Sequence, residues 1–76
     1  MGVEYKIRFP VKDRKNLEFF LTRLSKLYKE EVVVALENDG FYFCDNLGDR
    51  TIAANIFYRL IQEASNSCSQ IIIDEL

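Results

Sequence analysis

The first segment of the chain alternates between apolar and charged residues. Within Val3–Phe9 the apolar side chains occupy every second position, and the charged side chains between them are Glu4, Lys6 and Arg8. Because successive side chains of a strand point to opposite faces of a sheet, this alternation predicts a half-buried strand. Pro10 follows and ends the strand, since proline has no backbone N–H to donate to a neighbouring strand.

Two later segments carry the periodicity of an amphipathic helix. In the first, the apolar residues on one stripe are Leu17, Phe20, Leu21, Leu24, Leu27 and Tyr28. Asp13 or Asn16 can cap the start of this helix. In the second, the stripe consists of Ile52, Ala53, Ile56, Phe57, Leu60, Ile61 and Ala64. Asp49 is the candidate cap there, and we expect the helix to end at Asn66-Ser67.

Three further segments favour extended structure because they are rich in β-branched or aromatic residues. They are Glu31–Leu36, Phe41–Cys44 and Ser69–Glu75. Between the first two lies Asn38-Asp39-Gly40, whose residues tolerate the positive φ that tight turns require. We therefore expect these two strands to form a hairpin.

The predicted order of elements is β-α-β-β-α-β. Two right-handed crossovers around a central hairpin bring the four strands into one antiparallel sheet with the order 4-1-3-2 and both helices on one face. The sequence therefore predicts an α+β class and a ferredoxin-like sandwich, with residues 1–76 forming a single domain. The apolar stripes of both helices need a common apolar sheet face, which the alternation in Val3–Phe9 supplies.

Composition argues against catalysis. The 76 residues are 49% hydrophobic and 29% charged, with a net charge of −2 and no histidine. The absence of histidine removes the usual general base near neutral pH and the commonest ligand of transition metals. Neither GxGxxG nor GxxxxGK occurs in the chain, so no phosphate-binding loop is indicated. We expect no enzymatic activity, no cofactor and no bound metal.

The cysteines bear on the compartment. Cys44 ends the third predicted strand and Cys68 precedes the fourth, and the predicted sheet places these strands on either side of the first strand and the two cysteines at opposite ends. A disulfide needs Cα atoms within about 7 Å, so we expect two free thiols and a cytoplasmic location. No run of 18 apolar residues is present, so we expect no membrane partner.

One segment suggests a nucleic-acid partner. Gly40, Phe41 and Phe43 lie in Asp39–Asn46, which partly resembles the octamer on the third strand of RNA-recognition-motif domains. In that family the aromatic residues stack on bases from the open sheet face. The resemblance covers 8 of the 76 residues and lacks the basic anchor, because Asp39 stands there. A hairpin glycine followed by core aromatics explains the same residues, and the face that Phe41 and Phe43 occupy distinguishes the two interpretations.

The edges of the predicted sheet point to a protein partner. The second and fourth strands are edges, and their runs Val32-Val33-Val34 and Ile71-Ile72-Ile73 contain no lysine or proline to discourage pairing. Each run must place at least one aliphatic side chain on the open face, where it adds to an apolar patch. The candidate partner-binding face comprises Lys6, Arg8, Val33, Tyr42 and Ile72.

Two alternatives for this face stay open. Lys6 and Arg8 lie two residues apart and can clamp a phosphate or carboxylate, or they can pair with acidic residues on neighbouring strands. The patch can form a homodimer interface, or charged side chains can cover it in a monomer. We expect a non-catalytic binding or regulatory module that acts through the open sheet face or an edge strand. The alternative is a single-stranded nucleic-acid-binding domain. Two further alternatives rank below it: an enzyme that uses carboxylates, and a small-molecule sensor similar to ACT domains in topology.

Overall fold

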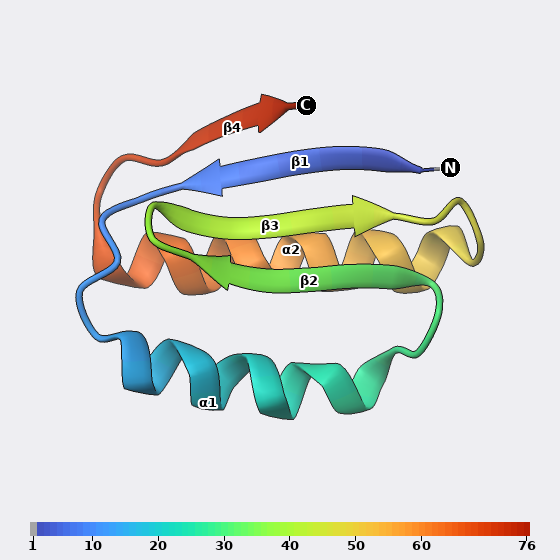
Figure 1. Cartoon of the computed structure of the whole chain (residues 1–76), viewed down its shortest axis with the longest axis horizontal. Coiled ribbons are helices and arrows are strands. Elements are labelled where there is room, and N and C mark those ends of the chain that lie inside the picture. Colours follow the sequence, from blue (N-terminus) through green and yellow to red (C-terminus); the bar gives the residue numbers. More distant parts are fainter. Residues whose placement is uncertain (1) are drawn as a thin grey trace.

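A computed structural model describes residues 2–76, apart from the side chain of Ser67. The elements follow one another as β1 (Val3–Arg8), α1 (Arg14–Leu24), the short 3-10 helix η1 (Ser25–Leu27), β2 (Val32–Glu37), β3 (Gly40–Asp45), α2 (Arg50–Ser67) and β4 (Ile72–Glu75). The chain is α+β, and its strands form a four-stranded antiparallel sheet with two open edges (Figure 1).

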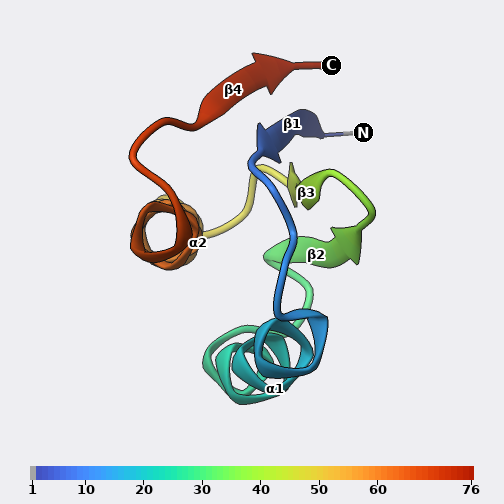
Figure 2. The same ribbon diagram turned by 90° about the vertical axis from the view of Figure 1, so that its left-hand side faces the viewer.

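The strands lie in the order β2-β3-β1-β4. This arrangement is the predicted 4-1-3-2 order read from the opposite edge. Phe20 of α1 contacts Phe41, and Phe57 of α2 contacts Phe43, with ring centroids 6.1 and 5.0 Å apart. Phe41 and Phe43 are two residues apart on β3 and therefore share one face of the sheet. Both helices cover that face, as the view along the strands shows (Figure 2).

An aspartate carboxylate caps the N-terminus of each helix. Asp13, rather than Asn16, caps α1, because its side chain accepts the Asn16 N–H at 3.3 Å. Asp49 caps α2 as predicted and accepts the N–H groups of Thr51 and Ile52. These bonds satisfy donors that have no partner within the helix.

The predicted stripe of α1 is wrong at its end. Leu24 is buried, but Leu27 is 48% exposed. The α-helix ends at Leu24 and η1 follows it, so Leu27 lies beyond α1, in the last residue of η1.

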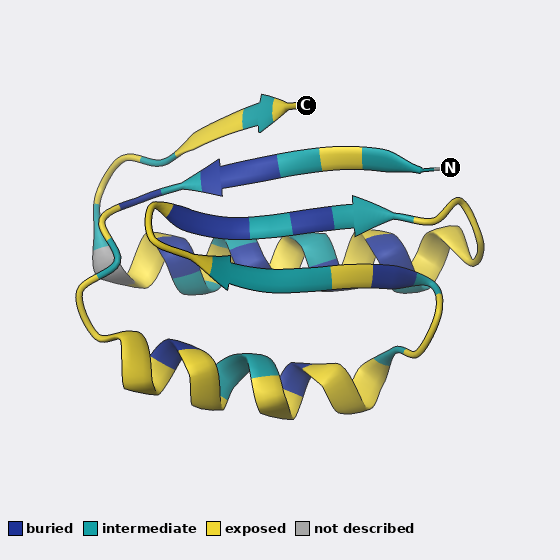
Figure 3. Cartoon of the chain, viewed as in Figure 1, coloured by how far each residue is buried: buried dark blue, intermediate teal, exposed yellow. Residues whose placement is uncertain are grey.

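The core lies between the covered face of the sheet and the two helices (Figure 3). Its largest fully buried side chains are Phe41, Ile7, Ile56, Leu60 and Val32. They come from β1, β2, β3 and α2, while α1 adds Leu17 and Leu24. Burying a large apolar side chain stabilises a fold by about 1.5–3 kcal/mol, so this cluster is the main source of stability.

The last strand is shorter than predicted. We expected Ser69–Glu75, but pairing with β1 begins only at Ile72, which lies opposite Arg8. Because β1 ends at Arg8, the residues before Ile72 have no neighbouring strand, and Ile71 packs against the core instead.

The predicted hairpin joins β2 to β3 through Asn38 and Asp39. Gly40 follows with φ +146°, and a Cβ atom there would lie 1.9 Å from the Ile7 carbonyl oxygen. Only glycine combines this φ with such close approach of a neighbouring backbone. Gly40 is thus what allows β3 to lie against β1 at this point.

Candidate binding surface

The residues of the predicted partner-binding face all lie on the open side of the sheet. Within the antiparallel register, Lys6 lies opposite Tyr42, and Arg8 lies opposite Ile72 on the other side of β1. Val33 lies on β2 opposite Cys44. The neighbours of these residues along the strands, such as Ile7 and Phe43, point into the core.

The two cations on this face, Lys6 and Arg8, form salt bridges with carboxylates. Lys6 pairs with Glu37 and, at 2.8 Å, with Asp39. Arg8 pairs with Asp39 and, through its Nε, with Asp74 at 2.8 Å. The hydrogen bond to Asp39 raises the pKa of Lys6, and the bond to Asp74 raises the pKa of Arg8. The reciprocal bond from Lys6 lowers the pKa of Asp39.

This ionic cluster of Lys6, Arg8, Glu37, Asp39 and Asp74 decides between the two interpretations of the cations. Lys6 is 9% exposed and satisfied by two carboxylates. The cluster contains two positive and three negative side chains, so it offers no net attraction to a phosphate. Cross-strand pairing, rather than an anion clamp, is what the geometry supports.

Tyr42 is held in place beside the cluster. Its hydroxyl donates a hydrogen bond of 2.8 Å to the Glu4 carboxylate. Because this bond requires the proton, it raises the pKa of Tyr42 to about 12. The ring is therefore a neutral, ordered part of the face at physiological pH.

The apolar residues of the open face do not form one patch. Val33 is 49% exposed on β2, opposite Cys44, whereas Ile72 is 56% exposed on β4, opposite Arg8. The register puts them at opposite edges and opposite ends of the sheet, with the ionic cluster between them. A continuous apolar area across the open face, as the sequence suggested, is therefore absent from the described residues.

The aromatic residues of the segment resembling RNA-recognition motifs lie on the other face. Phe41 and Phe43 are 0% and 2% exposed. Both are packed against aromatic residues of the helices. Neither can stack on a base from the open face, so the feature that suggested nucleic-acid binding is part of the core.

The two open edges of the sheet differ. At the β2 edge, Arg14 of α1 donates to the carbonyls of Leu36 and Glu37 at 3.3 and 3.5 Å. At the other end of β2, Val32 is buried. An arginine bonded to edge carbonyls and a helix packed nearby hinder the approach of another strand.

The β4 edge is accessible. Leu76 donates its N–H to the Glu4 carbonyl at 2.8 Å, which makes Glu4 and Leu76 a hydrogen-bonded pair. Such pairs alternate along an antiparallel ladder, so Ile72 and Asp74 also bond to β1. The backbone groups of Ile73 and Glu75 therefore point away from the sheet. On the described chain no strand lies beyond β4.

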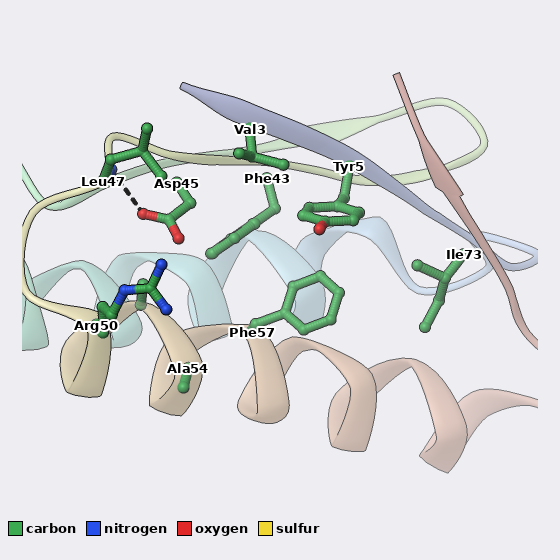
Figure 4. A pocket seen from close by; sticks show the side chains of 10 residues that line it. Val3, Tyr5, Phe43, Asp45, Leu47, Arg50, Ala54, Phe57 and Ile73 are labelled. Atoms are coloured by element: carbon green, nitrogen blue, oxygen red, sulfur yellow. Dashed lines mark hydrogen bonds between the residues drawn. The ribbon is translucent and has the colours of Figure 1, made fainter. Parts of the chain in front are cut away.

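An apolar groove of about 450 Å³ lies between the sheet and α2, next to this edge (Figure 4). Its lining residues include Val3, Tyr5, Phe43, Leu47, Phe57 and Ile73. Tyr5 and Phe43 contact Phe57 at centroid distances of 5.2 and 5.0 Å and form its floor. Ile73 stands at one end of the groove, and Leu47, Asp45 and Arg50 stand at the other.

Leu47 adopts an unusual backbone conformation at the rim of the groove. Its φ is +63°, and its side chain is 55% exposed. Its N–H donates to the Asp45 carboxylate at 2.8 Å, which stabilises the turn. The left-handed region costs a residue with a β-carbon about 1–2 kcal/mol, so the loop holds Leu47 against a local preference.

Sequence reasoning did not find the groove. Tyr5, Phe57 and Ile73 belonged to predicted strands and a predicted helix, and Leu47 lay between a predicted strand and a predicted helix. The available signal was a leucine among four turn-forming residues, Asp45, Asn46, Gly48 and Asp49. An apolar side chain in such a loop is a candidate rim residue for a contact surface.

Further findings concern the thiols, the metal-ligating side chains and the helices of the described residues. Cys44 and Cys68 are free thiols, as predicted. Within residues 2–76 no group of three or more metal-ligating side chains comes together. No described helix has the length and apolar character needed to cross a membrane. Comparisons of the chain with protein-family models, with curated proteins and with solved structures find no match.

Proposed function

We propose that this chain is a small binding or regulatory module without catalytic activity, and that it recognises a protein partner at the free edge of β4. The β4 surface comprises the outward backbone groups of Ile73 and Glu75 and the exposed side chains of Ile72 and Ile73. The observation that carries the proposal is that this edge combines unpaired backbone groups with side chains that are 56% and 44% exposed.

Strand addition is the recognition mode that suits this surface. An extended segment that pairs with an open edge gains affinity from main-chain hydrogen bonds and specificity from alternate side chains. Side chains of the added strand on the helix side would lie beside Ile73, where the groove begins. Those on the other side would lie beside Ile72 and Asp74.

The proposal includes the fold family and the compartment. The order of elements, the antiparallel sheet and the two helices on one face support a ferredoxin-like fold over residues 1–76. Fold alone assigns no activity, so the function rests on the β4 surface. The two free thiols support a cytoplasmic location, where the reducing environment preserves them.

Proline at position 73 tests strand addition. The Ile73 N–H points outward, so Ile73→Pro removes a donor to the partner without removing a bond to β1. Ile73→Ala is the matched control, because it shortens the side chain and keeps the N–H. We expect proteins captured from a lysate by the wild-type chain to be lost with Ile73→Pro and retained with Ile73→Ala, while both variants unfold cooperatively. Capture that Ile73→Pro leaves unchanged would refute strand addition.

The absence of catalysis has its own test. Purified chain is incubated with a panel of esters, phosphoesters and peptides, and we expect no turnover above the buffer rate. Activity that a single carboxylate substitution abolishes would show that the chain is an enzyme.

A further inference from the structure

We infer that the strand added at β4 is β4 of a second copy of this chain, paired antiparallel with Ile73 of each copy opposite Ile73 of the other. This inference rests on the proposed function, because it needs the β4 edge to accept a strand. It goes further by naming the partner and the register. The result is a continuous eight-stranded sheet with a two-fold axis between the two β4 strands.

The backbone restricts the possible registers. Hydrogen-bonded pairing across the new interface requires outward-facing residues of one copy opposite outward-facing residues of the other. Within β4 these are Ile73 and Glu75. Three antiparallel registers follow: Ile73 opposite Ile73, Ile73 opposite Glu75, and Glu75 opposite Glu75.

Charge distinguishes the three registers. With Ile73 opposite Glu75, the two Asp74 carboxylates lie directly opposite each other across the axis. With Glu75 opposite Glu75, the two Glu75 carboxylates lie directly opposite each other. Like charges directly opposite on neighbouring strands are destabilising. With Ile73 opposite Ile73, each Asp74 faces Ile72 of the other copy, so no two acidic residues of β4 face each other.

The ionic cluster fits this register. Asp74 is already bound to Arg8 at 2.8 Å. Along the row that crosses the interface, the side chains would follow as Arg8 and Ile72 of one copy, then Asp74 and Lys6 of the other. The carboxylate then has an apolar neighbour on one side and a cation on the other. Ile72 is 56% exposed in the single chain and would be partly buried by Asp74 of the other copy.

The same register covers the apolar residues on the helix side. An antiparallel pair of edge strands has its two-fold axis perpendicular to the sheet, so both copies of α2 lie on one face. The two Ile73 side chains, each 44% exposed, then meet at the axis. Each forms one end of its own groove, so pairing brings the two grooves end to end. Burial of these side chains provides a hydrophobic gain that backbone pairing alone lacks.

Disulfide cross-linking tests both the partner and the register. In a background with Cys44→Ser and Cys68→Ser, Ile73→Cys places two thiols on residues whose Cα atoms are about 5.5 Å apart, within the range of a disulfide. Ile72→Cys is the matched control. In this register its two copies are offset along the strands by two residues and lie about 8 Å apart. We expect mild oxidation to give a covalent dimer with Ile73→Cys and monomer with Ile72→Cys.

Sedimentation of the unmodified chain completes the test. We expect a dimer that Ile73→Pro dissociates and that Ile73→Ala weakens. A wild-type chain that stays monomeric at hundreds of micromolar would overturn the inference. If capture of another protein by that monomer still depended on the Ile73 N–H, strand addition would stand with a different partner. A dimer that cross-links through Ile72→Cys or Glu75→Cys, and not through Ile73→Cys, would overturn the register.

Discussion

The Lys6 ammonium lies 2.8 Å from the Asp39 carboxylate, across the open face of the sheet. Lys6 is on the central strand β1, and Asp39 is in the turn between β2 and β3, 33 residues later in the chain. The pair therefore fastens the hairpin turn to the centre of the sheet. Arg8 also bonds to Asp39, so one turn carboxylate serves two cations of the same strand.

This arrangement predicts a specific dependence of stability on acid pH. The hydrogen bond from Lys6 lowers the pKa of Asp39 below its ordinary value of 3.8. Below 3.8 the unfolded chain binds more protons at this position than the folded chain does, so stability falls as pH decreases through the folded pKa. The contribution is fully present above 3.8. We expect Asp39→Asn to flatten the stability profile between pH 2 and 5, measured by urea unfolding.

A matched variant separates this effect from net charge. Glu30→Gln removes one carboxylate from an exposed position between η1 and β2. We expect it to leave the slope of the acid profile close to that of the wild-type chain. A profile for Asp39→Asn that runs parallel to the wild type would contradict the assigned ion pairs.

Tyr42 predicts an effect at the other end of the pH range. Its bond to Glu4 raises the pKa of the phenol from 10.0 to about 12. Between these values the unfolded chain loses the proton while the folded chain keeps it, so stability is lost as pH rises from 10 to 12. In an ultraviolet titration we expect one of the four tyrosines to ionise near pH 12. Tyr42→Phe should remove that step, whereas Tyr58→Phe, at a position 60% exposed, should retain it.

Local patterns predicted most of the architecture. The alternation in Val3–Phe9 correctly assigned Lys6 and Arg8 to one face and Ile7 to the other, because strand periodicity is a property of the backbone. The apolar stripe that begins at Ile52 predicted a helix, and Asp49 caps that helix as predicted. The local pattern left open which side chains of the other strands face outward, and the register of the sheet places Val33, Tyr42 and Ile72 on the open face.

Features that depend on packing between distant segments were not predictable. The partners of Lys6 and Arg8 come from β2, the turn and β4, and only the three-dimensional register brings Glu37, Asp39 and Asp74 to them. The groove exists because α2 packs against β1 and β3 and leaves β4 uncovered. Nothing in the spacing of apolar residues fixes where a helix rests across a sheet.

Gly40 and Gly48 make a matched pair for testing the hairpin. Gly40→Ala forces a β-carbon into a conformation with φ +146° and to within 1.9 Å of the Ile7 carbonyl oxygen. Strain of this kind costs about 1–3 kcal/mol before the clash is added, so we expect a loss of more than about 2 kcal/mol in denaturant unfolding. Gly48→Ala meets no atom within 4 Å. We expect its stability to stay within about 0.5 kcal/mol of the wild type. Equal effects of the two substitutions would show that β3 does not approach β1 as described.

The last prediction concerns Leu47, because both its backbone strain and its exposure favour a gain in stability when it is replaced by asparagine. With φ +63° and a side chain 55% exposed, it loses little packing when it is replaced. Asparagine tolerates the left-handed region far better than leucine does. We therefore expect Leu47→Asn to raise the free energy of unfolding by up to about 1 kcal/mol, measured in urea.

The control for that variant is Leu47→Ala, which removes the same apolar side chain but keeps a β-carbon in the strained conformation. We expect it to give no comparable gain, because the cost of φ +63° persists. A gain with alanine equal to that with asparagine would locate the effect in the side chain instead of the backbone. A gain with asparagine and not with alanine would locate the cost in the backbone of Leu47, at the end of the groove away from the proposed β4 interface.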